Sequence, residues 1–149
     1  MQRYSRHLVL PEVGPEGQLR LKRSSVLVVG LGGLGVPAAV YVASAGVGRV
    51  GVVDSDSVEL SNLQRQFIFS NADLGRGKVD AAEEKLSLIN PQIRVIPHAV
   101  RFDSGNAMEV IREYDAIIDG DGQPAEPIPH QRRLHPSSET RFFEIPGRR

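Results

Sequence analysis

A glycine-rich turn directly follows an aliphatic run near the start of the chain. The chain reads VLVVGLGGLG up to Gly35, so Gly30, Gly32 and Gly35 fit the spacing G-x-G-x-x-G. Glycines let the backbone approach a phosphate, and the N-terminus of the following helix offers unpaired N–H groups to the anion. A second aliphatic run, 50–53, ends at Asp54, at about the distance expected for a carboxylate that binds a ribose hydroxyl. The spacing predicts a nucleotide site.

The polar stretch between Asp54 and Lys78 separates the families that bind nucleotides. It opens with DSDSVELSNLQRQ and closes with GRGK, and an ordinary dinucleotide-binding domain needs neither. The stretch carries cations, such as Arg65 and Lys78, of the kind that stabilises negative charge at a phosphate. On position alone, however, Lys78 can equally be a solvated surface charge, and a lone arginine is usually exposed.

Length and composition limit the classes of protein to which this chain can belong. A chain of 149 residues with 40% hydrophobic content is expected to fold as one domain around one core. Its 18 basic and 18 acidic residues leave no field that would attract nucleic acid. It has no long apolar run, no leader and no cysteine, so we expect a cytoplasmic protein without a membrane span, disulfides or thiolate metal sites.

Aliphatic runs alternate with helix-like segments as far as residue 119. We expect strands at 26–29, 49–54, 93–97 and 116–119, and helices ending at 22 and covering 33–45, 77–89 and 106–114. This alternation predicts an α/β fold with a doubly wound, Rossmann-like parallel sheet and a ligand crevice at the carboxyl ends of its strands. Residues 120–149 hold five of the ten prolines and show no period, so we expect a disordered tail and a sheet that is incomplete at its C-terminal side.

Five separated motifs resemble, in their order, the adenylation domain of E1-like activating enzymes of the ThiF/MoeB/HesA type. They are RYSRH at 3–7, GLGGLG at 30–35, AGVG at 45–48, the stretch 54–78, and INP at 89–91. The resemblance covers residues 3 to about 119. It is nearest to adenylyltransferases that activate molybdopterin synthase, thiamine-pathway sulfur carriers or ubiquitin-related modifiers of tRNA thiolation. Such enzymes use ATP and Mg²⁺ to convert the C-terminal carboxylate of a Gly-Gly-ending carrier protein into an acyl-adenylate.

The resemblance also implies roles for single residues. It places Gly33 under the phosphates, Asp54 on the ribose, and Arg65 and Lys78 at the reacting triphosphate. It implies that Arg6 reaches the nucleotide site of a partner subunit, in a homodimer or in a heterodimer with a full-length relative. The remaining implied nucleotide contacts are Gly30, Gly32, Gly35, Ser61, Asn62, Leu63 and Gln64. His7 and His98 show no metal-like spacing and are interpreted as structural or exposed.

The sequence departs from the family pattern after Asp119. The family continues as D-(C/A)-T-D-N, whose second aspartate serves Mg²⁺ and ATP, whereas this chain reads DGDGQ and places Gly122 and Gln123 at the last two positions. We therefore expect no metal ligand there, no zinc pairs of the Cys-x-x-Cys type, and impaired adenylation by a truncated chain. One extra base after the Asp119 codon would let the following codons encode ATDN. A frameshift is thus one hypothesis for residues 120–149, and a divergent natural tail is the other.

Two other functions fit part of the pattern. A dehydrogenase would use the glycine turn and Asp54 for NAD but would leave the segment 61–66 and Lys78 unexplained. A non-catalytic fragment would bind nucleotide, or associate with a full-length relative, without activating a carrier. Preference for NAD over ATP would mark the first, and ATP binding without carrier-dependent pyrophosphate exchange would mark the second.

Overall fold

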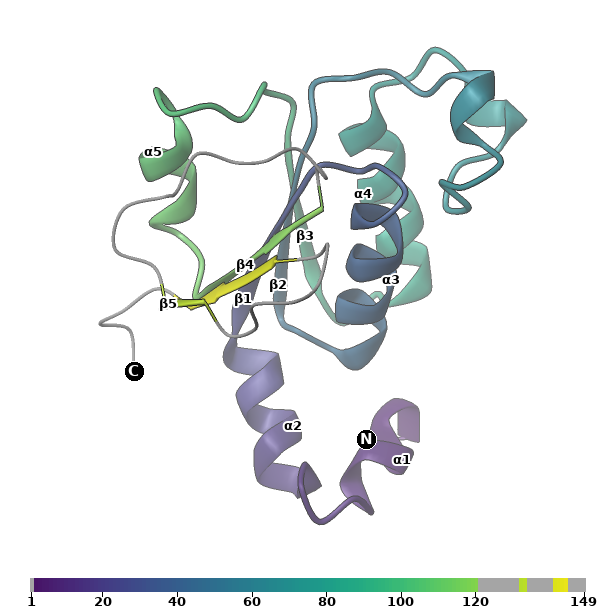
Figure 1. Cartoon of the computed structure of the whole chain (residues 1–149). Helices are drawn as coiled ribbons and strands as arrows, with labels where there is room; N and C mark the ends of the chain where they lie inside the picture. Colours follow the sequence, from purple (N-terminus) through teal and green to yellow (C-terminus); the bar gives the residue numbers. More distant parts are fainter. Residues whose placement is uncertain (1, 121–131, 134–140, 145–149) are drawn as a thin grey trace.

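A single sheet forms the middle layer of the molecule (Figure 1). The computed structural model describes residues 2–120, 132–133 and 141–144. Within these residues the sheet has six strands in the order β3-β2-β1-β4-β6-β5. The first four in sequence are mutually parallel: β1 (Ser25–Val29), β2 (Arg49–Val53), β3 (Arg94–His98) and β4 (Ala116–Asp119). The order 3-2-1-4 confirms the doubly wound α/β sheet, and each expected strand lies within one residue of its predicted bounds.

Helices lie on both faces of this sheet, as crossovers between parallel strands require (Figure 1). One face carries α3 (Gly35–Ala45) and α4 (Lys78–Ile89), and the other carries the short α5 (Ala107–Ile111). The helices α1 (Ser5–Leu8) and α2 (Gly14–Arg23) lie beyond the end at which the strands begin. Three 3₁₀ turns complete the description: η1 (Gln2–Tyr4), η2 (Leu60–Asn62) and η3 (Asn71–Asp73).

Two antiparallel strands extend the sheet beyond β4. The strand β6 (Arg141–Glu144) pairs with β4, and β5 (Arg132–Arg133) pairs with β6. The sequence analysis did not predict them, because residues 120–149 show no alternation of strands and helices in which a run of two or four residues would stand out. The rest of the tail that we expected to be disordered lies outside the residues that the structure describes.

The two faces of the central strands build two separate hydrophobic clusters. Successive strand residues point to opposite faces, so Val28, Val50 and Val52 pack under α3 and α4, while Leu27 and Val53 pack under α5. These aliphatic side chains have almost no exposed surface. The parallel sheet is therefore covered on both sides, which explains the nearly continuous aliphatic strands of the sequence.

A tyrosine fills the space that a glycine leaves on the α5 face. Tyr114 is fully buried, and a Cβ at Gly51 would overlap its side chain. Its hydroxyl is hydrogen-bonded to His98 Nε2 at 2.7 Å, and Arg49 lies 4.9 Å from the centre of its ring. Burial lowers the pKa of His98, and although the nearby Glu113 opposes this, Arg49 adds to it, so the net shift favours the neutral imidazole. His98 thus has a structural role, which is one of the two interpretations, structural or exposed, that the sequence left open.

Three of the five family motifs meet at the end of the sheet where the strands begin. Asn90 Nδ2 donates to Tyr4 Oη at 2.8 Å and to the Ala43 carbonyl at 2.7 Å, and Asn90 is fully buried. Gly46 ends α3 with φ +86°, and a Cβ there would lie 2.6 Å from the Tyr4 ring. The motifs around Tyr4, Gly46 and Asn90 therefore occur together because they pack as one anchor that fastens the N-terminal helices to the sheet.

This anchor yields a stability prediction. We expect Asn90→Ala to lower the free energy of unfolding by about 2 kcal/mol, because the buried Ala43 carbonyl loses its donor. Tyr4→Phe, which removes only the hydroxyl, should cost about 1 kcal/mol. Urea denaturation followed by circular dichroism measures both changes. Equal stability of Asn90→Ala and the unaltered chain would contradict the anchor.

Candidate functional site

The glycine turn lies between the carboxyl end of β1 and the start of α3. Gly30 has φ +80°, a conformation that favours glycine, and its N–H donates to the Val53 carbonyl at 2.8 Å. A Cβ at Gly35 would overlap the Gly30 carbonyl oxygen, so the first residue of α3 packs directly on the turn. A Cβ at Gly33, in contrast, would lie 3.5 Å from the Cδ atom of Arg65, which is an ordinary contact distance. The turn therefore presents bare backbone at Gly33, with the Arg65 stem beside it.

Asp54 fixes the shape of this turn. Its Oδ2 accepts a hydrogen bond from the Leu31 N–H at 2.7 Å, and its Oδ1 accepts from the Asp56 N–H at 2.8 Å. The side chain is 10% exposed and stands where β2 ends. The structure therefore brings the predicted ribose carboxylate and the glycine turn into contact, and each carboxylate oxygen keeps acceptor capacity for a ligand hydroxyl.

Lys78 is a buried cation beside that carboxylate. It is the first residue of α4 and is 5% exposed, so the alternative of a solvated surface charge is wrong. Its Nζ lies 3.1 Å from Asp56 Oδ2 and 3.8 Å from Asp54 Oδ2. An ammonium group has three donors on a flexible stem, so Lys78 can turn one of them to an anion at the glycine turn.

Arg65 approaches the glycine turn from the loop that follows β2. Its Nη1 donates to the Ser61 carbonyl at 2.9 Å, and its aliphatic stem lies next to Gly33. The residue is exposed, so its guanidinium keeps donors for a ligand. The structure thus brings Arg65 to the turn that the sequence predicted as the phosphate cradle.

The residues before Arg65 form the turn that holds it in place. Asn62 is buried, and its Oδ1 accepts from the Glu59 N–H at 3.1 Å, which closes a capping box around η2. Leu63 packs against the core under α3 and α4, whereas Ser61 and Gln64 are exposed. Direct nucleotide contacts of these four residues stay a prediction, while their support of Arg65 is visible in the structure.

Arg6 lies away from this group. It belongs to α1, which sits beyond the start of the strands, whereas the glycine turn follows the carboxyl end of β1 (Figure 1). The structure does not bring Arg6 together with the other predicted site residues of its own chain. Its predicted role in a partner subunit is untested by this arrangement.

Gln66 was not among the predicted site residues. It follows Arg65, is 2% exposed, and its Oε1 has no hydrogen-bond partner among the described residues. A buried carbonyl without a donor is costly, by about 1–3 kcal/mol. The sequence alone gives no signal of this, because burial and missing partners arise only from the folded loop.

The end of β4 lies next to the glycine turn, on the side of β1 opposite to β2. The Gly120 N–H donates to the Val29 carbonyl at 2.9 Å, and a Cβ at Gly120 would lie 2.6 Å from Gly35 Cα. The chain after Asp119 therefore leaves the sheet directly beside the glycine turn. Gly122 and Gln123, where the sequence departs from the family motif, lie outside the described residues.

The donor set suits a nucleotide better than a dedicated metal site. The described residues contain no group of three histidine, cysteine or carboxylate side chains that could hold a metal ion. Mg²⁺ commonly binds through substrate phosphates with one or two protein carboxylates, and here Asp54 already accepts two backbone N–H groups. The glycine turn, Asp54, Arg65 and Lys78 offer backbone N–H groups, a carboxylate and two cations, which are the kinds of group that bind a nucleotide.

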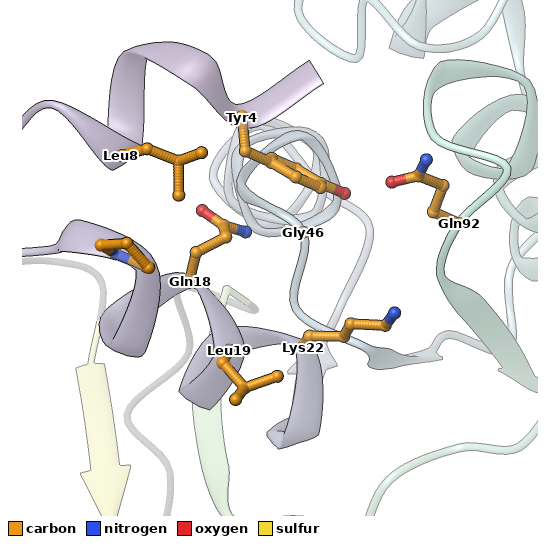
Figure 2. A pocket seen from close by; sticks show the side chains of 8 residues that line it. Tyr4, Leu8, Gln18, Leu19, Lys22, Gly46 and Gln92 are labelled. Atoms are coloured by element: carbon orange, nitrogen blue, oxygen red, sulfur yellow. The ribbon is translucent and has the colours of Figure 1, made fainter. Parts of the chain in front are cut away.

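A pocket of about 450 Å³ lies at the opposite end of the molecule, between α1, α2 and the end of α3 (Figure 2). Leu8 and Leu19 supply apolar walls, and Tyr4, Gln18 and Lys22 supply polar groups. Gln18 Nε2 donates to the Ala45 carbonyl at 2.9 Å, so part of the polar lining belongs to the anchor. Separately, no helix among the described residues is long and apolar enough to span a membrane.

Substitutions of two glycines, Gly33 and Gly35, test whether the glycine turn holds phosphates. We expect Gly33→Ala to leave the free energy of unfolding nearly unchanged, because the new methyl would meet only the flexible Arg65 stem, but to weaken nucleotide binding by occupying the phosphate surface. Gly35→Ala should destabilise the fold by about 3 kcal/mol or more, since its methyl would overlap backbone. Urea denaturation and titration calorimetry with ATP separate the two effects. Unimpaired ATP binding by Gly33→Ala would contradict the assignment.

Comparison with known proteins agrees with this geometry. The chain is 53% identical over 119 residues to the sulfur carrier protein adenylyltransferase of Thermus thermophilus, covering 80% of this chain and 44% of that protein. It is 52% identical over 118 residues to the probable adenylyltransferase/sulfurtransferase MoeZ of Mycobacterium tuberculosis, covering 79% and 30%. The chain thus spans less than half the length of these relatives.

The solved structures show the same fold. The crystal structure of E. coli tRNA N6-threonylcarbamoyladenosine dehydratase, TcdA, superposes with a TM-score of 0.77 at 27% identity, over 82% of this chain and 51% of that one. The pattern of the ThiF family matches residues 4–123, which include the glycine turn, Asp54, Arg65 and Lys78. By fold, by site geometry and by this match, the chain belongs to the ThiF family.

Proposed function

We propose that this chain forms the nucleotide-binding part of an adenylyltransferase, which uses ATP to activate the C-terminal glycine of a ubiquitin-like sulfur-carrier protein. The observation that carries the proposal is the placement of Arg65 over Gly33 together with the buried Lys78 beside Asp54. A site for a dinucleotide needs no such pair of cations. The names of the relatives, a sulfur carrier protein adenylyltransferase and an adenylyltransferase/sulfurtransferase, support the choice of reaction.

The proposed reaction joins a carboxylate oxygen of the carrier to the α-phosphorus of ATP, and the bond from that phosphorus to pyrophosphate breaks. Asp54 would hold the ribose, and the backbone at Gly33 would hold the phosphates. Lys78 and Arg65 would stabilise the charge that gathers as two anions approach and pyrophosphate leaves. Mg²⁺, which family members use with ATP, would add charge neutralisation on the triphosphate.

The carrier in this proposal is the small subunit of molybdopterin synthase or a ubiquitin-related modifier of tRNA thiolation. Both are proteins that end in Gly-Gly, and a short flexible tail of this kind can reach a recessed phosphate. The proposed setting is the cytoplasm. The proposal involves neither nucleic acid nor a membrane, in keeping with the balanced charge of the chain.

The departure at Gly122 bears on the rate of the reaction. We propose that the chain binds ATP but turns it over slowly, because the aspartate of the family motif is replaced there by glycine. A non-catalytic nucleotide-binding fragment is the limiting case of this proposal. Gly122→Asp should then raise carrier-dependent pyrophosphate exchange, whereas no gain in this variant would mean that position 122 does not limit the rate.

Lys78→Met is the direct test of the proposed site. We expect it to raise the dissociation constant of ATP about tenfold or more, because a charge-assisted contact to phosphate is lost. Lys22→Met, which removes a cation at the opposite end of the molecule, serves as the matched control and should bind like the unaltered chain. Calorimetric titration with ATP and with NAD measures both. Tighter binding of NAD than of ATP would overturn the proposal in favour of a dehydrogenase.

Arg6 provides a test of the proposed dimer. If Arg6 completes the partner's site, both Arg6→Ala and Lys78→Met should bind ATP weakly when studied alone. Mixing them should restore tight binding at one site of each mixed dimer, because that site has both cations intact. Sedimentation analysis establishes the dimer, and calorimetry counts the tight sites. Failure of the mixed dimers to regain tight binding would contradict the role of Arg6.

A further inference from the structure

Residues 54–78, here called the cation loop, form one closed unit. Val58 N–H donates to the Arg76 carbonyl at 2.9 Å, and Gly75 N–H donates to the Val58 carbonyl at 2.9 Å, so the two ends of the loop are fastened together. The loop projects above α4 in Figure 1 and carries both proposed phosphate-binding cations. Its internal contacts therefore decide where those cations stand.

Asp73 is the most heavily bonded side chain of the cation loop. Its carboxylate is 1% exposed and accepts from Ser70 N and Ser70 Oγ, both at 2.8 Å, and from Arg76 Nη1 at 3.0 Å; Lys85 Nζ lies 2.8 Å away. Burial alone would raise the pKa of Asp73, but the hydrogen bonds from Lys85 and Ser70 outweigh it and hold the pKa at about 2. The group is thus a buried, fully paired anion.

These bonds connect the cation loop to α4. Lys85 belongs to α4, and Arg76 also donates to Glu84 of that helix at 2.7 Å. On the loop side, Ser70 directly follows Phe69, which is buried in the core. One buried negative charge therefore joins the middle of the loop, its closing end and the helix that begins with Lys78.

We propose that Asp73 is a positioning residue for ATP, which sets the placement of Arg65 and Lys78 relative to the glycine turn. This inference rests on the proposed function of the site. Asp73 acts through the loop rather than by touching the nucleotide, since its hydrogen-bond and ion-pair partners are Ser70, Arg76 and Lys85. Without its charge, the cations at positions 76 and 85 lose their shared anion, and the loop loses the buried one of its links to α4, while the exposed pair of Arg76 with Glu84 remains.

The test compares two ligands that differ only in phosphates. We expect Asp73→Asn to raise the dissociation constant of ATP about tenfold, because a displacement of Arg65 and Lys78 weakens their charge-assisted contacts with the phosphates. Adenosine should bind within about twofold of its normal affinity, because Asp54 and the glycine turn hold the nucleoside without this network. Calorimetry on the full chain gives both constants. Glu109→Gln, which removes an exposed carboxylate from α5, is the matched control and should change neither.

A purely structural role would not shift the ratio of the two affinities, because a less folded chain loses ATP and adenosine binding by the same factor. Equal loss, or no loss, overturns the inference while leaving the proposed function intact. Failure of the unaltered chain to bind ATP overturns both. If Asp73→Asn does not fold, Lys85→Gln serves in its place, because it removes one partner of the carboxylate. We expect it to raise the ratio of the ATP dissociation constant to the adenosine dissociation constant, but by less than Asp73→Asn would. An unchanged ratio in Lys85→Gln overturns the inference.

Discussion

The hydrogen bond from the Leu31 N–H to Asp54 Oδ2 ties the site together. It joins the turn after β1 to the residue after β2, which are neighbouring parallel strands, so the glycine turn cannot move independently of the sheet. Around this bond, the first residue of α3 packs on Gly30, and the buried Lys78 approaches the same carboxylate. The proposed phosphate cradle is therefore shaped by contacts within the chain itself, which would lower the cost of ordering it on binding.

The charged groups of the candidate site form two sets, the cations beside the glycine turn and the buried anion behind them. Lys78 and Arg65 are held close to the glycine turn, and a separate buried anion, Asp73, holds the loop that carries them. The buried Lys78 has a carboxylate partner, and Arg65, which donates to a carbonyl, is exposed, so neither is a buried charge without compensation. In the proposed reaction, a triphosphate would replace these partners while the contacts of Asp73 remain in place.

The sequence was sufficient to predict what local pattern encodes. Aliphatic runs and the glycine spacing located β1 to β4 within one residue, and the start of α3 moved from Gly33 to Gly35 because Gly33 belongs to the turn. Burial of Lys78, the unpartnered Gln66 oxygen and the bonds of Asp73 were beyond sequence reasoning, since each depends on segments that meet only after folding. The motifs around Tyr4 and Asn90 were recognised, but their shared role as an anchor appears only in the fold.

The central claim is that this turn and these two cations hold the triphosphate of ATP. A crystal structure of the chain with a non-hydrolysable ATP analogue tests it most directly. The account predicts the ribose at Asp54, the phosphates against Gly33, and Lys78 Nζ within hydrogen-bond distance of a phosphate oxygen. Density for the nucleotide in the pocket beside Tyr4, or phosphates turned away from Arg65 and Lys78, would contradict the account.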